Sequence, residues 1–194
     1  GTFETEYLLF NGTSDIFQIP ANIAPQLAGS NITIEFWTKL SGNTKTHQAI
    51  YHQGNNVPGE LLSIYLTANG VNMSFSFFDK HIYYDVSAYF NIWTHFAFTY
   101  DNSATTNNDA AKMYINGSLV TNPLFYNNIY EGTSASGIAC IGGDLTTYGY
   151  LDGYLKKLKI WNNVRTESEI QNTITDLGNG NYEPNLSDYS TILE

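Results

Sequence analysis

Apolar and polar side chains alternate with a period of two along several short segments of the chain. Ile32, Ile34 and Phe36 alternate with other residues over 32–37, and the same pattern recurs over 71–77 and 96–100. This period places successive side chains on opposite faces of a strand. We therefore expect one face of each strand to enter a core and the other to meet water or a ligand. Further short segments rich in Val, Ile, Thr, Tyr, Phe and Trp predict strands at 7–10, 15–19, 49–52, 61–67, 81–86, 112–115, 118–121, 138–141 and 154–161.

Turn-forming dipeptides lie between several of these segments. Asn-Gly occurs at 69–70 and at 116–117, each time between two segments with strand character. Because a type I′ turn needs positive φ at both central residues, Asn-Gly predicts a β-hairpin at each place. The polar segment 102–111 is expected to be a loop, and Gly142, Gly143 and Gly153 are expected where the chain reverses or approaches another backbone closely.

One helix is predicted, at 167–175. Thr166 and Glu169 have the spacing of a capping box, and Ile170 and Ile174 supply one apolar edge. About a dozen strands with so little helix predict an all-β sandwich or barrel. We expect a single domain over 1–176 and a polar tail over 177–194, which is either a linker or a strand returning to the sheet.

Composition and charge exclude several classes of protein. Charged residues make up 13% of the 194 residues and aromatic residues 15%, a balance that excludes a disordered chain. Only 8 Lys and Arg stand against 18 Asp and Glu, which leaves no basic patch for nucleic acid. No apolar run approaches the length of a membrane span. Cys140 is the single cysteine, so an intrachain disulfide is excluded, and a buried, inert thiol is expected there.

Four segments, in this order, resemble a laminin G-like domain of the concanavalin A-like lectin/glucanase superfamily. They are 9–15 (LFNGTSD), 32–37 (ITIEFW), 93–101 (WTHFAFTYD) with the hairpin 113–117, and 141–143 with 151–153 and 158–162. The resemblance covers roughly residues 7–171. It implies a two-sheet antiparallel jelly-roll β-sandwich with one short helix near the C-terminus. It also implies a recognition module of a secreted or cell-surface protein, as part of a larger multidomain chain. Trp93 is expected to close one end of the sandwich, and His95 to pack within a sheet.

No constellation of residues predicts catalysis. Glucanases of the superfamily carry paired acids on one strand as Glu-x-Asp-x-x-Glu, a spacing that suits two closely placed carboxylates. No strand here carries that pattern, and Glu35 is the single acid on its predicted strand. The four histidines lack metal-ligand spacing, and no Gly-x-Ser-x-Gly motif occurs. We expect no enzyme activity; a glycosidase relative is the least favoured alternative.

The resemblance implies calcium as a candidate cofactor, since related domains bind it between the opening turn and the last long strand. Asp15 lies in the opening turn and Asp152 at the start of the last strand, so both are calcium candidates. Lys156 stands where the family carries an acid. An ammonium group repels a cation. Our hypothesis is that Lys156 replaces the calcium, while a second cation site elsewhere stays open.

Tyrosines beside amides and acids predict where a ligand binds. A saccharide site combines an aromatic ring for stacking with groups that form hydrogen bonds. The candidates fall into three groups: Tyr126, Asn127, Asn128 and Tyr130; Asp144, Tyr148 and Tyr150; and His81 with Tyr83. The sequence therefore favours a lectin-like or adhesive domain that binds a glycan. The alternative is a structural domain that binds extracellular protein, with these tyrosines merely rimming a large sandwich.

Overall fold

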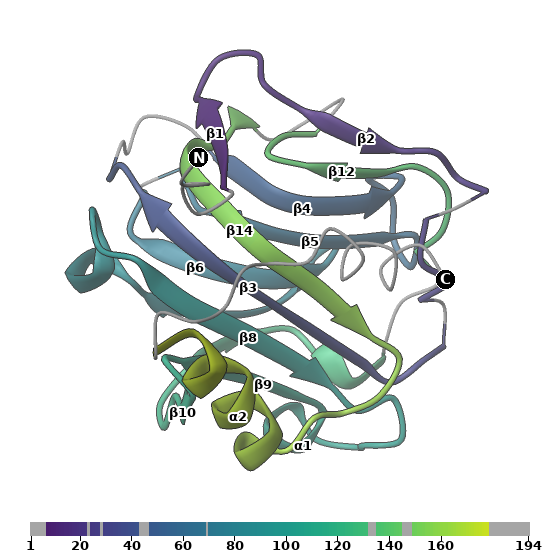
Figure 1. Ribbon diagram of the computed structural model, residues 1–194. Helices are drawn as coiled ribbons and strands as arrows, with labels where there is room; N and C mark the ends of the chain where they lie inside the picture. The colour runs from purple at the N-terminus through teal and green to yellow at the C-terminus, as the bar shows by residue number, and fades with distance from the viewer. Residues whose placement is uncertain are drawn as a thin grey trace.

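The computed structural model describes residues 7–22, 24–27, 29–42, 47–68, 70–131, 135–144 and 149–178. These residues form two β-sheets packed face to face, with one helix against the outer side of the smaller sheet (Figure 1). The predicted all-β jelly-roll sandwich is confirmed. Of the predicted tail 177–194, residues 177 and 178 belong to the last helix and the rest lies outside the described residues.

The smaller sheet has six strands, and all its pairs are antiparallel. In spatial order these are β1 (Leu8–Asn11), β14 (Asp152–Trp161), β3 (Ile32–Leu40), β8 (Thr94–Tyr100), β9 (Ala111–Ile115) and β10 (Ser118–Leu119). The first and last strands of the fold, β1 and β14, therefore pair with each other. This pairing brings the opening turn to the start of β14.

The larger sheet has eight strands. Its order is β11 (Leu124–Tyr126), β7 (Lys80–Asp85), β6 (Asn72–Phe77), β5 (Leu61–Leu66), β4 (Gln48–Gly54), β12 (Ala139–Ile141) and β2 (Phe17–Ile19), and β13 (Gly149–Tyr150) pairs with β4 in parallel. The strands β4 to β7 follow one another in both sequence and space, and each pairs antiparallel with the next. The strand β11 reaches the sheet from much later in the chain and pairs with the edge of β7.

Aromatic side chains from both sheets fill the space between them. Phe36 of β3 and Phe98 of β8 stack with their ring centroids 6.2 Å apart, and Phe75 of β6 stacks on Phe98 at 5.6 Å. All three are fully buried. Burial of such rings is the main source of stability in a two-sheet core. The period of two in 32–37, 71–77 and 96–100 predicted these inward positions correctly.

The hairpin at 116–117 and the helix are also confirmed; β5 and β6 pair antiparallel around the other predicted turn, but its Asn69 lies outside the described residues. Asn116 and Gly117 both have positive φ, 49° and 79°, as a type I′ turn requires. The helix α2 (Glu167–Gly178) begins where it was predicted and extends three residues further. Its capping box is formed: the Thr166 amide donates to Glu169 Oε2 at 2.7 Å, and the Glu169 amide to Thr166 Oγ1 at 3.3 Å.

Two local expectations were wrong. The polar segment 102–111 contains a short helix, α1 (Asn107–Ala110), because the Thr106 side chain accepts from the Asp109 amide and caps a single turn. Trp93 does not close an end of the sandwich; its ring lies 6.1 Å from that of Tyr154, on the outer side of the smaller sheet. Two single 3₁₀ turns, η1 (Ser87–Tyr89) and η2 (Ile129–Glu131), were not predicted.

Gly142 lies where two segments approach too closely for any side chain. A Cβ atom at this position would lie 1.8 Å from Cε1 of Phe10, and the backbone φ is +78°. The predicted close approach at this glycine is therefore confirmed, and it fixes the end of β12 against β1.

Candidate functional site

The outer side of the larger sheet, which faces away from the smaller sheet, carries rings and hydroxyl groups. Ile82 and Tyr84 of β7 contact the core, so the alternating His81 and Tyr83 point outward. The register pairs Tyr126 of β11 with His81 and Leu124 with Tyr83. Two of the three predicted groups of ligand residues are thus brought together, although 45 positions separate His81 from Tyr126 in the sequence.

Four rings form a row across this outer side. The ring of Tyr126 lies 5.8 Å from that of His81, His81 lies 6.2 Å from Tyr65, and Tyr65 stacks on His47 at 5.4 Å. These residues come from β11, β7, β5 and the residue before β4. We call Tyr126, His81, Tyr65 and His47 the ring row. The intervening strand β6 contributes only small side chains there, Ser74 and Ser76.

Hydrogen bonds hold the imidazole of His81 in one orientation. Its Nδ1 atom lies 3.1 Å from the Tyr65 hydroxyl oxygen and 3.3 Å from Ser74 Oγ. Burial lowers the pKa of His81, against a smaller opposing effect of the Asp79 carboxylate. The ring is therefore neutral near pH 7 and can donate or accept a hydrogen bond at its second nitrogen.

The ring row is open to solvent at its β11 end. Tyr126 is 56% exposed and its neighbour Leu124 is 59% exposed, whereas Tyr65 is buried. An exposed phenol ring next to a fixed imidazole offers a stacking face and a hydrogen-bonding group side by side. This is the combination that a saccharide site needs.

The other residues of the first predicted group support the loop after β11. The Asn127 side chain donates to the Asp79 carbonyl oxygen at 2.9 Å and to Asp79 Oδ2 at 3.3 Å. The backbone of Asn128 accepts from the Glu131 amide, and its side chain is exposed. Tyr130 packs against the core, and its carbonyl oxygen accepts from the Tyr100 hydroxyl at 3.2 Å. Tyr130 and Asn127 therefore position Tyr126.

The remaining predicted group lies around the end of β12 and the β13 strand that pairs with β4. Asp144 is buried behind β12, with Oδ2 3.9 Å from Nδ1 of His52, and Tyr150 packs over Gly143. Three strands, β6, β5 and β4, separate β7 from β12. Tyr148 lies outside the described residues. Tyr150 belongs to β13, which pairs with β4 next to His47, and the Gly149 amide donates to the His47 carbonyl oxygen at 2.7 Å. The structure thus places Tyr150 near the His47 end of the ring row, at the end opposite to Tyr126.

Cys140 of β12 lies near Asp144 but does not form a nucleophilic site. It pairs in register with His52, and it is 1% exposed. Burial, together with the Asp144 carboxylate, raises the pKa of the Cys140 thiol. A thiol with a raised pKa stays protonated and unreactive. The predicted burial of Cys140 is confirmed, and the raised pKa agrees with the inert thiol expected there.

The two calcium candidates, Asp15 and Asp152, flank the opening turn. Asp15 Oδ2 accepts from the Asn11 amide at 3.0 Å, and a Cβ at Gly12 would lie 2.9 Å from Cβ of Asp152. Among the residues that the structure describes, no three His, Cys, Asp or Glu side chains gather into a group suited to a metal ion. Calcium binding at this turn stays a prediction.

The hypothesis for Lys156 needs correction. Asn11 pairs with Asp152, so Lys156 lies four residues further along β14, about 13 Å away at 3.3 Å per residue. Its ammonium group lies 4.2 Å from the ring centroid of Trp93. The residue of β14 that faces the opening turn is Asp152, and the ammonium does not occupy the place predicted for it.

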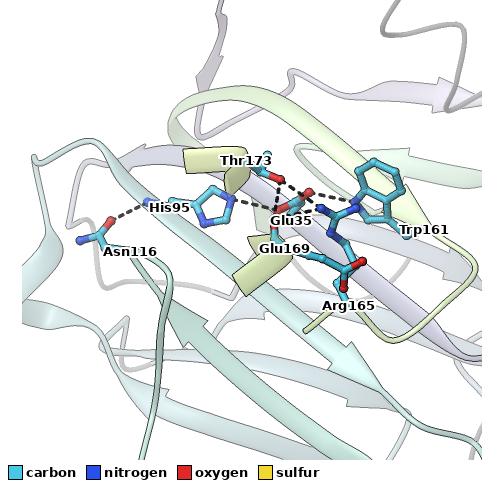
Figure 2. Close-up of polar contacts among 7 residues, drawn as sticks. All are labelled: Glu35, His95, Asn116, Trp161, Arg165, Glu169 and Thr173. Carbon is cyan, nitrogen blue, oxygen red and sulfur yellow. Dashed lines mark hydrogen bonds and ion pairs between the residues drawn. The ribbon is translucent and has the colours of Figure 1, made fainter. Parts of the chain in front are cut away.

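A polar cluster that includes Glu35, His95 and Trp161 lies beneath α2 on the smaller sheet (Figure 2). Glu35 Oε1 accepts from Trp161 Nε1 at 2.8 Å, and Glu35 Oε2 lies 3.4 Å from Nε2 of His95. Both Glu35 and His95 are about 1% exposed or less. Ile170 of α2 packs against Ala97 beside them. The sequence did not predict this cluster, because its partners come from four distant segments.

Among the described residues, the cluster beneath α2 holds one buried carboxylate, that of Glu35. A retaining mechanism needs two carboxyl groups about 5 Å apart. Glu35 and Asp144 are the buried acids among the described residues, and they belong to opposite sheets. His95 packs in its sheet as expected, with its ring 5.5 Å from Trp37. We assign the cluster to attachment of α2.

Comparisons with known proteins bear on the fold. No curated protein matches the chain. A pentraxin from Limulus polyphemus, heptameric and described as SAP-like, has a similar structure: TM-score 0.62, 15% identity, 87% of this chain and 81% of that one. The receptor binding domain of botulinum neurotoxin D matches with TM-score 0.67 and 16% identity over 91% of this chain and 45% of that one. The type G domain matches with TM-score 0.55 and 18% identity over 87% and 46%.

The chain spans less than half of those toxin domains. No helix in the described part of the chain is long and apolar enough to cross a bilayer. A laminin G family model, described as the concanavalin A-like lectin/glucanases superfamily, matches residues 11–171, which is more than half of the sequence. The chain belongs to the concanavalin A-like lectin/glucanases superfamily.

Proposed function

We propose that this chain is a non-catalytic, lectin-like module that binds glycans at the exposed end of the ring row. One observation carries the proposal: Tyr126, 56% exposed, stands beside a His81 ring that two hydroxyl groups hold in place. A pyranose would lay its apolar face on Tyr126 and form hydrogen bonds with His81 and Tyr83. Such contacts are weak singly and gain strength when several copies act together.

The setting that fits this function is a secreted or cell-surface protein, with this domain as part of a larger chain. The family includes lectins, and two of the similar structures are receptor binding domains of toxins. At 15–18% identity these similarities support the fold only. The chemistry of the ring row is therefore the stronger support for glycan binding.

A glycan array probed with the chain, followed by titration of the strongest hit, tests the proposal. Tyr126→Ala removes the stacking face and should weaken binding about fivefold, since an aromatic contact contributes about 1 kcal/mol. Tyr126→Phe keeps the ring and should bind almost as well as the original chain. Phe17→Ala is the matched control, because Phe17 is 57% exposed at the opposite edge of the same sheet.

Two results would overturn the proposal. One is a blank array with correctly folded protein, which would favour a structural or protein-binding domain. The other is equal glycan binding by Tyr126→Ala and by the original chain, which would move the site elsewhere.

A further inference from the structure

A second cluster of rings lies on the opposite side of the molecule, on the outer face of the smaller sheet. The rings of Tyr7, Trp93 and Tyr154 are mutual neighbours, with centroids 6.1 Å, 5.2 Å and 6.1 Å apart. Tyr7 is 46% exposed, and Trp93 and Tyr154 are partly exposed. These rings line the first part of β14, away from the cluster beneath α2.

Two lysines are set among these rings. The Lys156 ammonium lies 4.2 Å from the ring centroid of Trp93 and 5.9 Å from that of Trp37. The Lys39 ammonium lies 5.9 Å from the ring centroid of Tyr154, its register partner. We call Tyr7, Lys39, Trp93, Tyr154 and Lys156 the ring–lysine face.

The ring–lysine face is unusual for this chain because it carries two positive charges, whereas the whole sequence has only 8 Lys and Arg against 18 Asp and Glu. Among the described residues, the ion pairs found involve His52, Lys80 and His95. Neither Lys39 nor Lys156 is held by a carboxylate of that part of the chain. Burial lowers the pKa of Lys156, so its charge is partly desolvated on the rings. An anion arriving there would replace the lost hydration.

We propose that the ring–lysine face binds the carboxylate of an acidic monosaccharide unit, such as a uronic or sialic acid. The two ammonium groups receive the carboxylate, and the partly exposed rings of Tyr7 and Tyr154 receive the apolar face of the sugar. Lys39 of β3 pairs with Tyr154 of β14, and Lys156 lies two residues further along β14. The two lysines are therefore diagonal neighbours on adjacent strands. The backbones of diagonal neighbours in a sheet are about 7–8 Å apart, a spacing that long lysine side chains can span to reach one carboxylate.

A single acidic unit fits this face better than a polyanion or an anionic membrane does. The net charge of the chain is −10. That charge repels any extended negative surface, and two lysines cannot compensate for it. A terminal carboxylate meets only the local field of the two ammonium groups. The rings favour a ligand with a flat apolar face, which a pyranose has.

The test compares two ligands that differ only in the acidic group, methyl β-D-glucuronide and methyl β-D-glucoside. Binding to the full chain is followed by NMR shift perturbation and by tryptophan fluorescence, for which Trp93 is a local reporter. We expect the glucuronide to bind at least tenfold more tightly than the glucoside. Lys156→Gln and Lys39→Gln should each remove most of this preference.

Lys112→Gln is the matched control. Lys112 is a lysine of β9 in the same sheet, and it pairs with Thr99, away from the ring–lysine face. This variant changes the net charge by the same amount and should keep the full preference. Thermal unfolding of each variant separates loss of binding from loss of fold.

Several outcomes would overturn this inference. Equal binding of glucuronide and glucoside would do so, as would an unchanged preference in Lys156→Gln. Binding to vesicles of phosphatidylserine and phosphatidylcholine without binding of glucuronide would make the face a membrane contact instead. The site is separate from the ring row, so Tyr126→Ala should leave the glucuronide preference intact. Absence of glucuronide binding at the ring–lysine face would therefore not contradict glycan binding at the ring row. Absence of glycan binding at the ring row would likewise not contradict this inference.

Discussion

The Nδ1 atom of His81 lies 3.1 Å from the hydroxyl oxygen of Tyr65, although β6 runs between their strands. The contact exists because the intervening residues on that side of β6 are small: Ser74 pairs with Tyr65 and Ser76 pairs with His81, and Ser74 Oγ lies 3.3 Å from the same nitrogen. A large side chain at position 74 would separate the two rings. The short side chain thus lets the ring row continue across the sheet.

Replacing the Tyr65 hydroxyl should loosen this arrangement. Tyr65→Phe removes the hydroxyl group that lies 3.1 Å from His81 Nδ1 and keeps the ring that stacks on His47. We expect the free energy of unfolding to fall by about 1 kcal/mol, the usual contribution of one buried hydrogen bond. Urea denaturation measures this loss. Tyr83→Phe, on the same outer side, should change stability by less than about 0.5 kcal/mol; equal effects of the two variants would contradict the prediction.

Stability should decrease in mildly acidic solution. Burial is the main cause that lowers the pKa of His47, His52 and His81 below the ordinary value of 6.5. Between the folded pKa values and 6.5 the unfolded chain binds more protons, so the free energy of unfolding falls as the pH drops through this window. We expect a lower Tm at about pH 5.5 than at about pH 7.

Calorimetry at the two pH values checks this dependence, and His81→Gln should make it weaker. The pKa values of Asp85 and Asp101 are also lowered, first by hydrogen bonds from Ser87 and Ser103. Their effect appears only as the pH falls below their ordinary value of 3.8, outside the range compared. A Tm that is constant or higher at pH 5.5 would refute the histidine effect.

Gly142 should tolerate no side chain. In Gly142→Ala the new Cβ would lie 1.8 Å from Cε1 of Phe10 at a backbone φ of +78°. We expect a loss of about 3 kcal/mol or more, from overpacking together with the unfavourable φ. Gly59→Ala is the control, because its φ is +79° and nothing lies within 4 Å of the new Cβ. It should cost only about 1 kcal/mol by denaturant unfolding, and an equal cost at both sites would show that φ alone matters.

Loss of Glu35 should destabilise the attachment of α2. Glu35→Ala leaves Trp161 Nε1 and His95 Nε2 without the acceptor that they contact at 2.8 Å and 3.4 Å. A buried donor left without its acceptor costs about 1–3 kcal/mol. Glu35→Gln retains an oxygen for Trp161 and should cost less. Chemical denaturation of both variants measures the difference, and an alanine variant as stable as the original chain would rule out a stabilising cluster.

Sequence patterns predicted the elements better than they predicted the sites. The period of two identified the inward residues Phe36, Phe75 and Phe98, because alternation is a local property of each strand. The Asn116–Gly117 turn and the capping box at Thr166 were also predictable, since a turn or a cap depends on a few adjacent residues.

The sites depend on which strands become neighbours. Tyr126 meets His81 only because β11 returns to pair with β7, and no local pattern encodes that pairing. The sequence did not predict Tyr65 and His47 as ligand residues. Tyr65 lies in a strand, and His47 just before one, whose residue patterns indicated only core positions. Trp93 was expected to close one end of the sandwich because it precedes a core strand, but it lies on the outer face of the smaller sheet, next to Tyr154 and Lys156.

The ring row and the ring–lysine face look outward from opposite sheets of the sandwich. If each holds a saccharide, the two ligands leave the molecule in opposite directions with the whole core between them. A single copy would then tether two separate glycan chains without dimerising. Such a domain would cross-link its surroundings, and its apparent valency in an agglutination assay would be two.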